Sequence, residues 1–139
     1  MSGRQSSGDG RWAWAVVGSA GVSAAGLFVH NVADLPGQTL LSPESLYPIL
    51  FTVALVAAWF TPIRRIASWA LLGWAALNLV GGGIVSVLPL PVLPFDPEQS
   101  WRHYAFHLLY VVSQLPLLIV TARWLQRHRR PPRPQSSAP

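Results

Sequence analysis

Residues 12–32 read WAWAVVGSAGVSAAGLFVHNV, an apolar stretch without a single charged side chain. As an α-helix that rises 1.5 Å per residue, it would extend about 31 Å, close to the thickness of the hydrocarbon core of a bilayer. A polar segment rich in Ser and Gly precedes it and ends in Arg11. The stretch therefore predicts a transmembrane helix. A cleaved signal peptide is the alternative, because a basic residue followed by an apolar run also fits that pattern.

The composition of the whole chain supports a membrane protein. Of its 139 residues 51% are hydrophobic and 11% are charged, whereas about a quarter of the residues of a soluble domain are charged. Five acidic residues are too few to cover a globule of this size with a solvated surface. The absence of cysteine excludes disulfides, thiol catalysis and thiolate metal sites.

Three more apolar runs follow, separated by proline, glycine and capping residues. Ser42-Pro43-Glu44 has a capping residue before a proline, which is typical of a helix start, and Pro48 offers a second start for the same helix. Thr61-Pro62 repeats the start signal at once, which predicts a tight turn between antiparallel neighbours. We expect an all-α, four-helix transmembrane bundle with spans at about residues 12–32, 46–60, 62–88 and 99–125.

Two stretches interrupt the regular helical pattern. Gly81-Gly82-Gly83 weakens the third helix but allows close helix contact in lipid. The four prolines of residues 88–97 predict an extended path, and Asp96-Pro97-Glu98-Gln99 predicts the cap of the last helix. Pro116 should bend that helix. Around the transmembrane domain, residues 12–125, we expect disordered cytoplasmic tails at residues 1–11 and at the basic, Pro-rich residues 126–139.

The distribution of arginine predicts the orientation. With an even number of spans both ends of the chain lie on one side, which would hold every arginine except Arg102. The positive-inside rule then places both ends in the cytoplasm. A chain rich in Ala, Gly and Pro, with arginine and no lysine, is typical of a GC-rich bacterial genome. We therefore expect a multi-pass protein of the bacterial cytoplasmic membrane, surrounded by lipid. Assembly into a homo-oligomer or a larger membrane complex is compatible with the sequence, and no nucleic-acid partner is expected.

Polar residues inside the first and last spans follow helical spacing. The last span has His103, His107, Tyr110 and Gln114 at i, i+4, i+7 and i+11, on one face. The first span has a similar polar and small-residue face, made of Ser19, Ser23, Gly26, His30 and Asp34. Polar groups inside a membrane are expensive, so both faces should point toward protein rather than lipid.

If these two spans are neighbours, their ionisable residues converge near the outer surface. Imidazole and carboxylate groups are ligands for zinc, copper or iron, so the predicted metal ligands are His30, Asp34, His103 and His107. Imidazole ligands also need a hydrogen-bond acceptor, for which Asn31, Glu98 and Tyr104 are candidates. Asn78, Tyr110 and Gln114 would lie beneath the ion and contact a small polar ligand.

The sequence is also compatible with other functions. A noncatalytic accessory or scaffold subunit would use the same polar residues only to hold its helices together. An electron carrier with b-type haem would use His30 opposite His103 or His107, with residues 81–83 leaving space for the macrocycle. Because the sequence has no catalytic or nucleotide-binding motif, it favours a binding role over an enzyme.

Overall fold

The computed structural model describes residues 3–128, with side chains from residue 10 onward, and this part of the chain is helical without a strand. Its elements are α1 (Gly3–Asp34), α2 (Pro43–Trp59), α3 (Arg64–Leu77), the π-helix η1 (Asn78–Ile84), the 3-10 turn η2 (Val85–Val87) and α4 (Trp101–Arg127).

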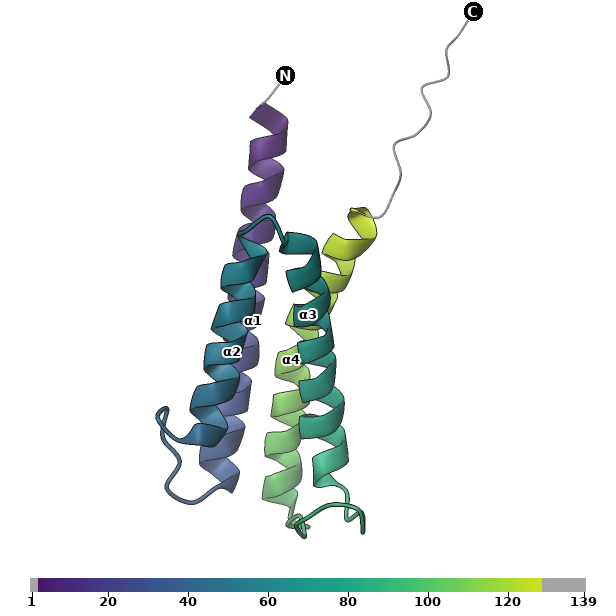
Figure 1. Ribbon diagram of the computed structural model, residues 1–139. Coiled ribbons are helices and arrows are strands. Elements are labelled where there is room, and N and C mark those ends of the chain that lie inside the picture. The colour runs from purple at the N-terminus through teal and green to yellow at the C-terminus, as the bar shows by residue number, and fades with distance from the viewer. Residues whose placement is uncertain (1–2, 129–139) are drawn as a thin grey trace, which may run out of the picture.

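The helices run up and down beside one another (Figure 1). The beginning of α1, the α2–α3 turn and the end of α4 lie at one end of the bundle, and the loops 35–42 and 88–100 lie at the other. The α2–α3 turn is short because hydrogen bonds close it locally: Thr61 Oγ1 donates to the Ala58 carbonyl at 2.7 Å, and the Arg64 amide donates to the Thr61 carbonyl at 3.1 Å. Because the helices alternate in direction, the end of α1 and the start of α4, which carry the histidines, lie at the same end of the bundle, opposite this turn.

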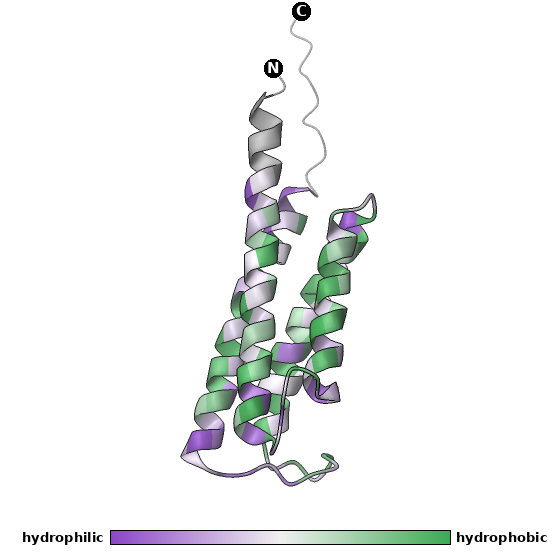
Figure 2. Ribbon diagram, turned by 90° about the vertical axis from the view of Figure 1, so that its left-hand side faces the viewer, coloured by the Kyte–Doolittle hydropathy of each residue, from purple (hydrophilic) through white to green (hydrophobic). Residues whose placement is uncertain are grey.

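Three helical segments are long and apolar enough to cross a membrane: Gly10–Asp34, Arg64–Val87 and Trp101–Arg127. The fourth helix, α2, is apolar but has only 17 residues. Figure 2 shows apolar residues along most of the middle of the bundle and hydrophilic residues mainly toward its two ends. This distribution fits a membrane protein, since the apolar surface faces outward and the polar groups gather at the ends.

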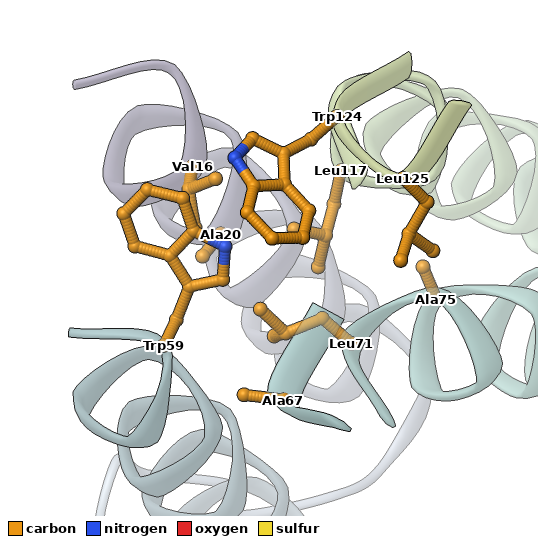
Figure 3. Close-up of a cluster of buried hydrophobic side chains, with 9 residues drawn as sticks. All are labelled: Val16, Ala20, Trp59, Ala67, Leu71, Ala75, Leu117, Trp124 and Leu125. Atoms are coloured by element: carbon orange, nitrogen blue, oxygen red, sulfur yellow. The ribbon is translucent and has the colours of Figure 1, made fainter. Parts of the chain in front are cut away.

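The apolar core lies toward the end that holds the α2–α3 turn (Figure 3). Trp59 and Trp124 meet there edge to face, with ring centroids 5.9 Å apart. Leu71 and Leu117 are fully buried beside them. The cluster consists of Val16, Ala20, Trp59, Ala67, Leu71, Ala75, Leu117, Trp124 and Leu125. Residues of all four helices contribute to this cluster, and the buried histidines lie toward the other end of the bundle.

The structure sets the bounds of α1 and α2. α1 begins at Gly3, so the helix continues through much of the segment expected to be a disordered tail. α2 begins at Pro43, and Pro48 lies inside it, which decides between the two possible starts. Pro48 lacks an amide proton, so it leaves the Glu44 carbonyl without its usual partner. Asn31 Nδ2 of α1 donates to that carbonyl at 2.9 Å, and the proline thereby creates a tie between α1 and α2.

The third helical region, Arg64–Val87, is continuous but irregular. Its glycines lie in η1, where the expected loosening takes the form of a π-helix. A π-helix shifts hydrogen bonds from i→i+4 to i→i+5 and changes which carbonyl groups are free. The Gly83 carbonyl, near the end of this π-helix, becomes part of the site described below.

The expected cap of the last helix at Asp96 is wrong, and Ser100 caps α4 instead. Ser100 has an extended backbone, and its Oγ accepts from the His103 amide at 3.2 Å. The proline-rich segment holds the chain out of helical conformation past Asp96, so the first free capping residue is Ser100. Farther along, α4 bends in its C-terminal half, which contains Pro116 (Figure 1). It ends at Arg127, and most of the expected C-terminal tail, residues 129–139, lies outside the described residues.

Candidate metal centre

The structure brings together the four residues predicted as metal ligands. His30 and Asp34 lie one turn apart on α1, and His103 and His107 lie one turn apart on α4. Asp34 Oδ2 is 3.1 Å from His30 Nε2, 3.0 Å from His103 Nδ1 and 3.7 Å from His107 Nε2. The two Nε2 atoms of His30 and His107 are 3.0 Å apart. All four side chains are mostly shielded from solvent, and His107 is only 4% exposed.

Hydrogen bonds at the other ring nitrogens assign the tautomers of two histidines. His107 Nδ1 lies 3.1 Å from the Gly83 carbonyl, and His30 Nδ1 lies 3.3 Å from Asn31 Oδ1. A carbonyl oxygen can only accept, so in each ring Nδ1 carries the proton and donates it. In the neutral rings Nε2 then carries a lone pair. The Nε2 atoms of His30 and His107 therefore face one another, and either a shared proton or a bound metal ion between them would satisfy both lone pairs.

The spacing of the three donor atoms fits one small metal ion. Ligand atoms around tetrahedral zinc, at bonds of about 2.0–2.1 Å, lie about 3.3 Å apart. The separations among His30 Nε2, His107 Nε2 and Asp34 Oδ2 are 3.0, 3.1 and 3.7 Å. Among the described side chains, His30, Asp34 and His107 form a group whose ligand atoms lie close enough together to hold one ion. Adjustments of a few tenths of an ångström would complete the geometry.

The polar atoms left without partners also point to a cation. Asp34 Oδ2 is buried and has no partner in hydrogen-bond geometry among the described residues, although three imidazole rings surround it. A buried carboxylate oxygen without a hydrogen bond is costly unless a positive charge faces it. His103 approaches the same oxygen with Nδ1, and its Nε2 also has no partner among the described residues. His103 falls outside the three-residue group and contacts it through Asp34.

A cavity of about 330 Å³ adjoins the cluster at the loop end of the bundle. Besides the four predicted ligands, its walls include Ser86 and the loop carboxylates Asp96 and Glu98. Both carboxylates are exposed. The cavity thus connects the buried nitrogen and oxygen atoms to a negatively charged surface, which would attract cations.

The polar residues expected beneath the ion contact other helices. Tyr110 Oη donates to Asn78 Oδ1 at 2.6 Å, and Asn78 Nδ2 donates to the Trp74 carbonyl at 2.8 Å. Gln114 Oε1 accepts from Ser23 Oγ at 2.5 Å, and Gln114 Nε2 donates to the Ser23 carbonyl at 3.2 Å. None of Asn78, Tyr110 and Gln114 is among the residues that line the cavity.

The acceptors of the imidazole protons were predicted only in part. Asn31 does accept from His30, but Tyr104 donates to Gln99 Oε1 at 2.5 Å, and Glu98 lies in the cavity wall. The acceptor for His107 is a backbone carbonyl, that of Gly83, which no side-chain pattern reveals. Its one sequence signal is the glycine triplet, which allows α4 to approach the backbone closely.

The same distances argue against haem held between His30 and His107. A haem iron with two axial imidazoles separates their nitrogens by two metal–nitrogen bonds, about 4 Å, and the macrocycle lies between them. His30 Nε2 and His107 Nε2 are 3.0 Å apart, and their ring centroids are 4.3 Å apart. This pair leaves no space for a macrocycle.

No protein-family model, curated protein or solved structure matches the chain. The chemistry of the site must therefore be inferred from its own atoms.

Proposed function

We propose that this protein is a four-span membrane protein that binds one divalent transition-metal ion through His30, Asp34 and His107. The observation that carries the proposal is the pair of Nε2 atoms of His30 and His107, 3.0 Å apart and beside Asp34, with both Nδ1 atoms within hydrogen-bond distance of carbonyl oxygens. In this proposal His103 positions Asp34, and the fourth coordination position faces the cavity. An open position of this kind lets a metal site take up water or a small polar ligand.

Zinc is one of the metals that fit the donor set, and it serves as the probe ion. Two imidazoles and a carboxylate suit zinc, copper and iron, whereas magnesium and calcium prefer oxygen ligands alone. The three donor separations, 3.0, 3.1 and 3.7 Å, bracket the value of about 3.3 Å for tetrahedral zinc, and two of them lie close to the value of about 3.0 Å for adjacent ligands of an octahedral ion. The hydrogen bonds from Nδ1 to the Gly83 carbonyl and to Asn31 are those that commonly orient imidazole ligands.

In the proposed topology all four helices span the bacterial cytoplasmic membrane and the metal site faces outward. As a helix of 17 residues, α2 is about 25 Å long, at the lower limit for a span. The arginines whose side chains the structure describes at the end opposite the site are Arg11, Arg64, Arg65, Arg123 and Arg127. At the site end the described residues contain one arginine, Arg102. By the positive-inside rule the first end is cytoplasmic, as are both ends of the chain.

Zinc binding to purified protein tests the metal proposal. The detergent-solubilised chain is dialysed against zinc, and bound metal is measured by elemental analysis. We expect one zinc per chain, and His107→Ala should weaken binding by more than about 100-fold because it removes a ligand. The matched control is His128→Ala at the far end of α4, where Nδ1 donates to the Trp124 carbonyl at 2.7 Å.

Three results would contradict the metal proposal. Equal zinc binding by the wild type and His107→Ala would place the metal elsewhere. An absence of zinc from the folded wild type would leave the noncatalytic accessory or scaffold role, in which the polar cluster only joins α1 to α4. A haem absorption band in the purified protein would favour the electron carrier. Helical circular dichroism of each variant checks that the substitutions leave the bundle folded.

A further inference from the structure

The end of the bundle opposite the histidines has a second polar cavity. It measures about 310 Å³, lies between the start of the apolar part of α1 and the end of α4, and is lined by Arg11, Trp12, Ala15 and Arg127. Both arginines are exposed. The guanidinium carbon of Arg127 lies 5.2 Å from the centroid of the Trp12 ring, within the range of a cation–π contact. The cavity thus holds two cationic side chains, one of them supported by an aromatic ring.

The positive charge of this cavity has no counter-charge among the described side chains. The acidic residues whose side chains the structure describes, all at the opposite end of the bundle, are Asp34, Glu44, Asp96 and Glu98. Arg123, one helical turn before Arg127, adds to the positive charge. Guanidinium groups bind phosphate oxygens through paired hydrogen bonds, so this cavity has the chemistry of a phosphate site.

The surroundings of the cavity indicate a phosphate that carries acyl chains. Trp14, two residues after Trp12 and outside the cavity lining, is 79% exposed, as is typical of the aromatic residues that lie at the headgroup level of a membrane. Arg11, Ala15, Gly18 and Val22 follow one face of α1 at i, i+4, i+7 and i+11. Gly18 has open space where a side chain would lie, and Val22 is exposed. An apolar, open strip therefore begins directly beneath the cations.

We propose that this cavity binds the phosphate headgroup of an anionic phospholipid, with one acyl chain along the strip of α1. Arg11 and Arg127 bind the phosphate oxygens, and Trp12 holds the Arg127 guanidinium in place. The proposal rests on the membrane embedding proposed above and does not depend on the metal site. A soluble phosphate compound would use the two arginines but gain nothing from the strip.

Retention of lipid by the full chain tests this site. Protein in nanodiscs of equal parts phosphatidylcholine and phosphatidylglycerol is released into the gas phase, and the bound lipids are counted by native mass spectrometry. We expect preferential retention of phosphatidylglycerol, which Arg11→Gln and Arg127→Gln each lower by about fivefold. Arg65→Gln is the matched control, because it removes one charge from the same end at an exposed residue outside the cavity. It should change retention less than twofold.

The controls of this experiment distinguish the lipid site from its alternatives. An equal loss in all three variants would show diffuse surface attraction and overturn the proposal, as would retention that no variant changes. Inorganic phosphate at matched ionic strength should not displace the lipid, and displacement would indicate a site for free anions instead. His107→Ala should retain phosphatidylglycerol as the wild type does, so a failure of the metal proposal is distinguishable from a failure of this one.

Discussion

Gln114 shows how a polar residue is accommodated in the middle of a span. It is fully buried, and both of its amide atoms have partners: Oε1 accepts from Ser23, and Nε2 donates to Ser23 and, at 3.1 Å, to Ser113 Oγ. Such bonds between helices contribute about 0.6 kcal/mol each on average. Gln114 therefore joins α1 to α4 below the histidines.

Replacing Gln114 by leucine should destabilise the bundle without affecting the metal. We expect Gln114→Leu to lower the free energy of unfolding by about 0.6–1.7 kcal/mol, because Ser23 loses its partner across the helix interface. Unfolding in mixed micelles measures this loss. Gln126→Leu, at an exposed residue of the same helix, is the control. A normal stability together with weakened zinc binding would instead show that Gln114 contacts the bound ligand.

The sequence identified the residues of the candidate site but not their geometry. His30 with Asp34, and His103 with His107, are spaced at i, i+4, which places each pair on one helix face wherever the helix packs. The tautomer of His107, by contrast, depends on a carbonyl in another helix. That contact exists only after the bundle has packed.

Among the helical elements, η1 is the one that positions His107. A Cβ at Gly83 would lie 2.5 Å from Val111 Cγ2, and one at Gly82 would lie 2.9 Å from Tyr110 Cε1. Glycine at these positions lets α4 approach the backbone closely enough for the Gly83 carbonyl to reach His107. The glycine triplet indicates a weakened helix, but the π-helix itself depends on packing against α4.

Gly83→Ala should therefore weaken metal binding from a distance. The added methyl must move Val111 or the η1 backbone, and the carbonyl that orients His107 moves with it. We expect zinc affinity to fall by about 10- to 100-fold, as when the hydrogen-bond partner of an imidazole ligand is lost. Gly81→Ala should bind zinc normally, since a Cβ there meets only Leu77 Cδ1 at 3.6 Å. Equal affinities of the two variants in a zinc competition titration would exclude this role of η1.

The two ends of the bundle differ in charge and in packing. One end holds the apolar core and most of the described arginines. The other holds the histidine cluster, where Arg102 Nη2 of α4 donates to the Ala33 carbonyl of α1 at 3.1 Å. The number of helices and the turn between α2 and α3 were predictable from apolar runs and proline signals. The start of α1 was not, because residues 3–11 are rich in Gly and Ser, which disfavour a helix.

Reporter fusions test the proposed orientation. Alkaline phosphatase inserted near Gly37, in the loop beside the metal site, should be active because that loop lies outside the cytoplasm. A fluorescent protein fused after Pro139 should fold and fluoresce in the cytoplasm. The opposite pair of results would show that the bundle has the inverted orientation, with the metal site on the cytoplasmic side, contrary to the distribution of arginine.

The central claim is that one ion lies between His30, Asp34 and His107. X-ray absorption at the zinc edge of the zinc-loaded protein tests it most directly, because the signal reports the atoms bound to the metal. The proposed site should show only nitrogen and oxygen neighbours at about 2.0–2.2 Å, with the scattering of two imidazole rings, and one ring fewer in any zinc retained by His107→Ala. A spectrum without imidazole scattering, or one that His107→Ala leaves unchanged, would exclude the proposed ligands.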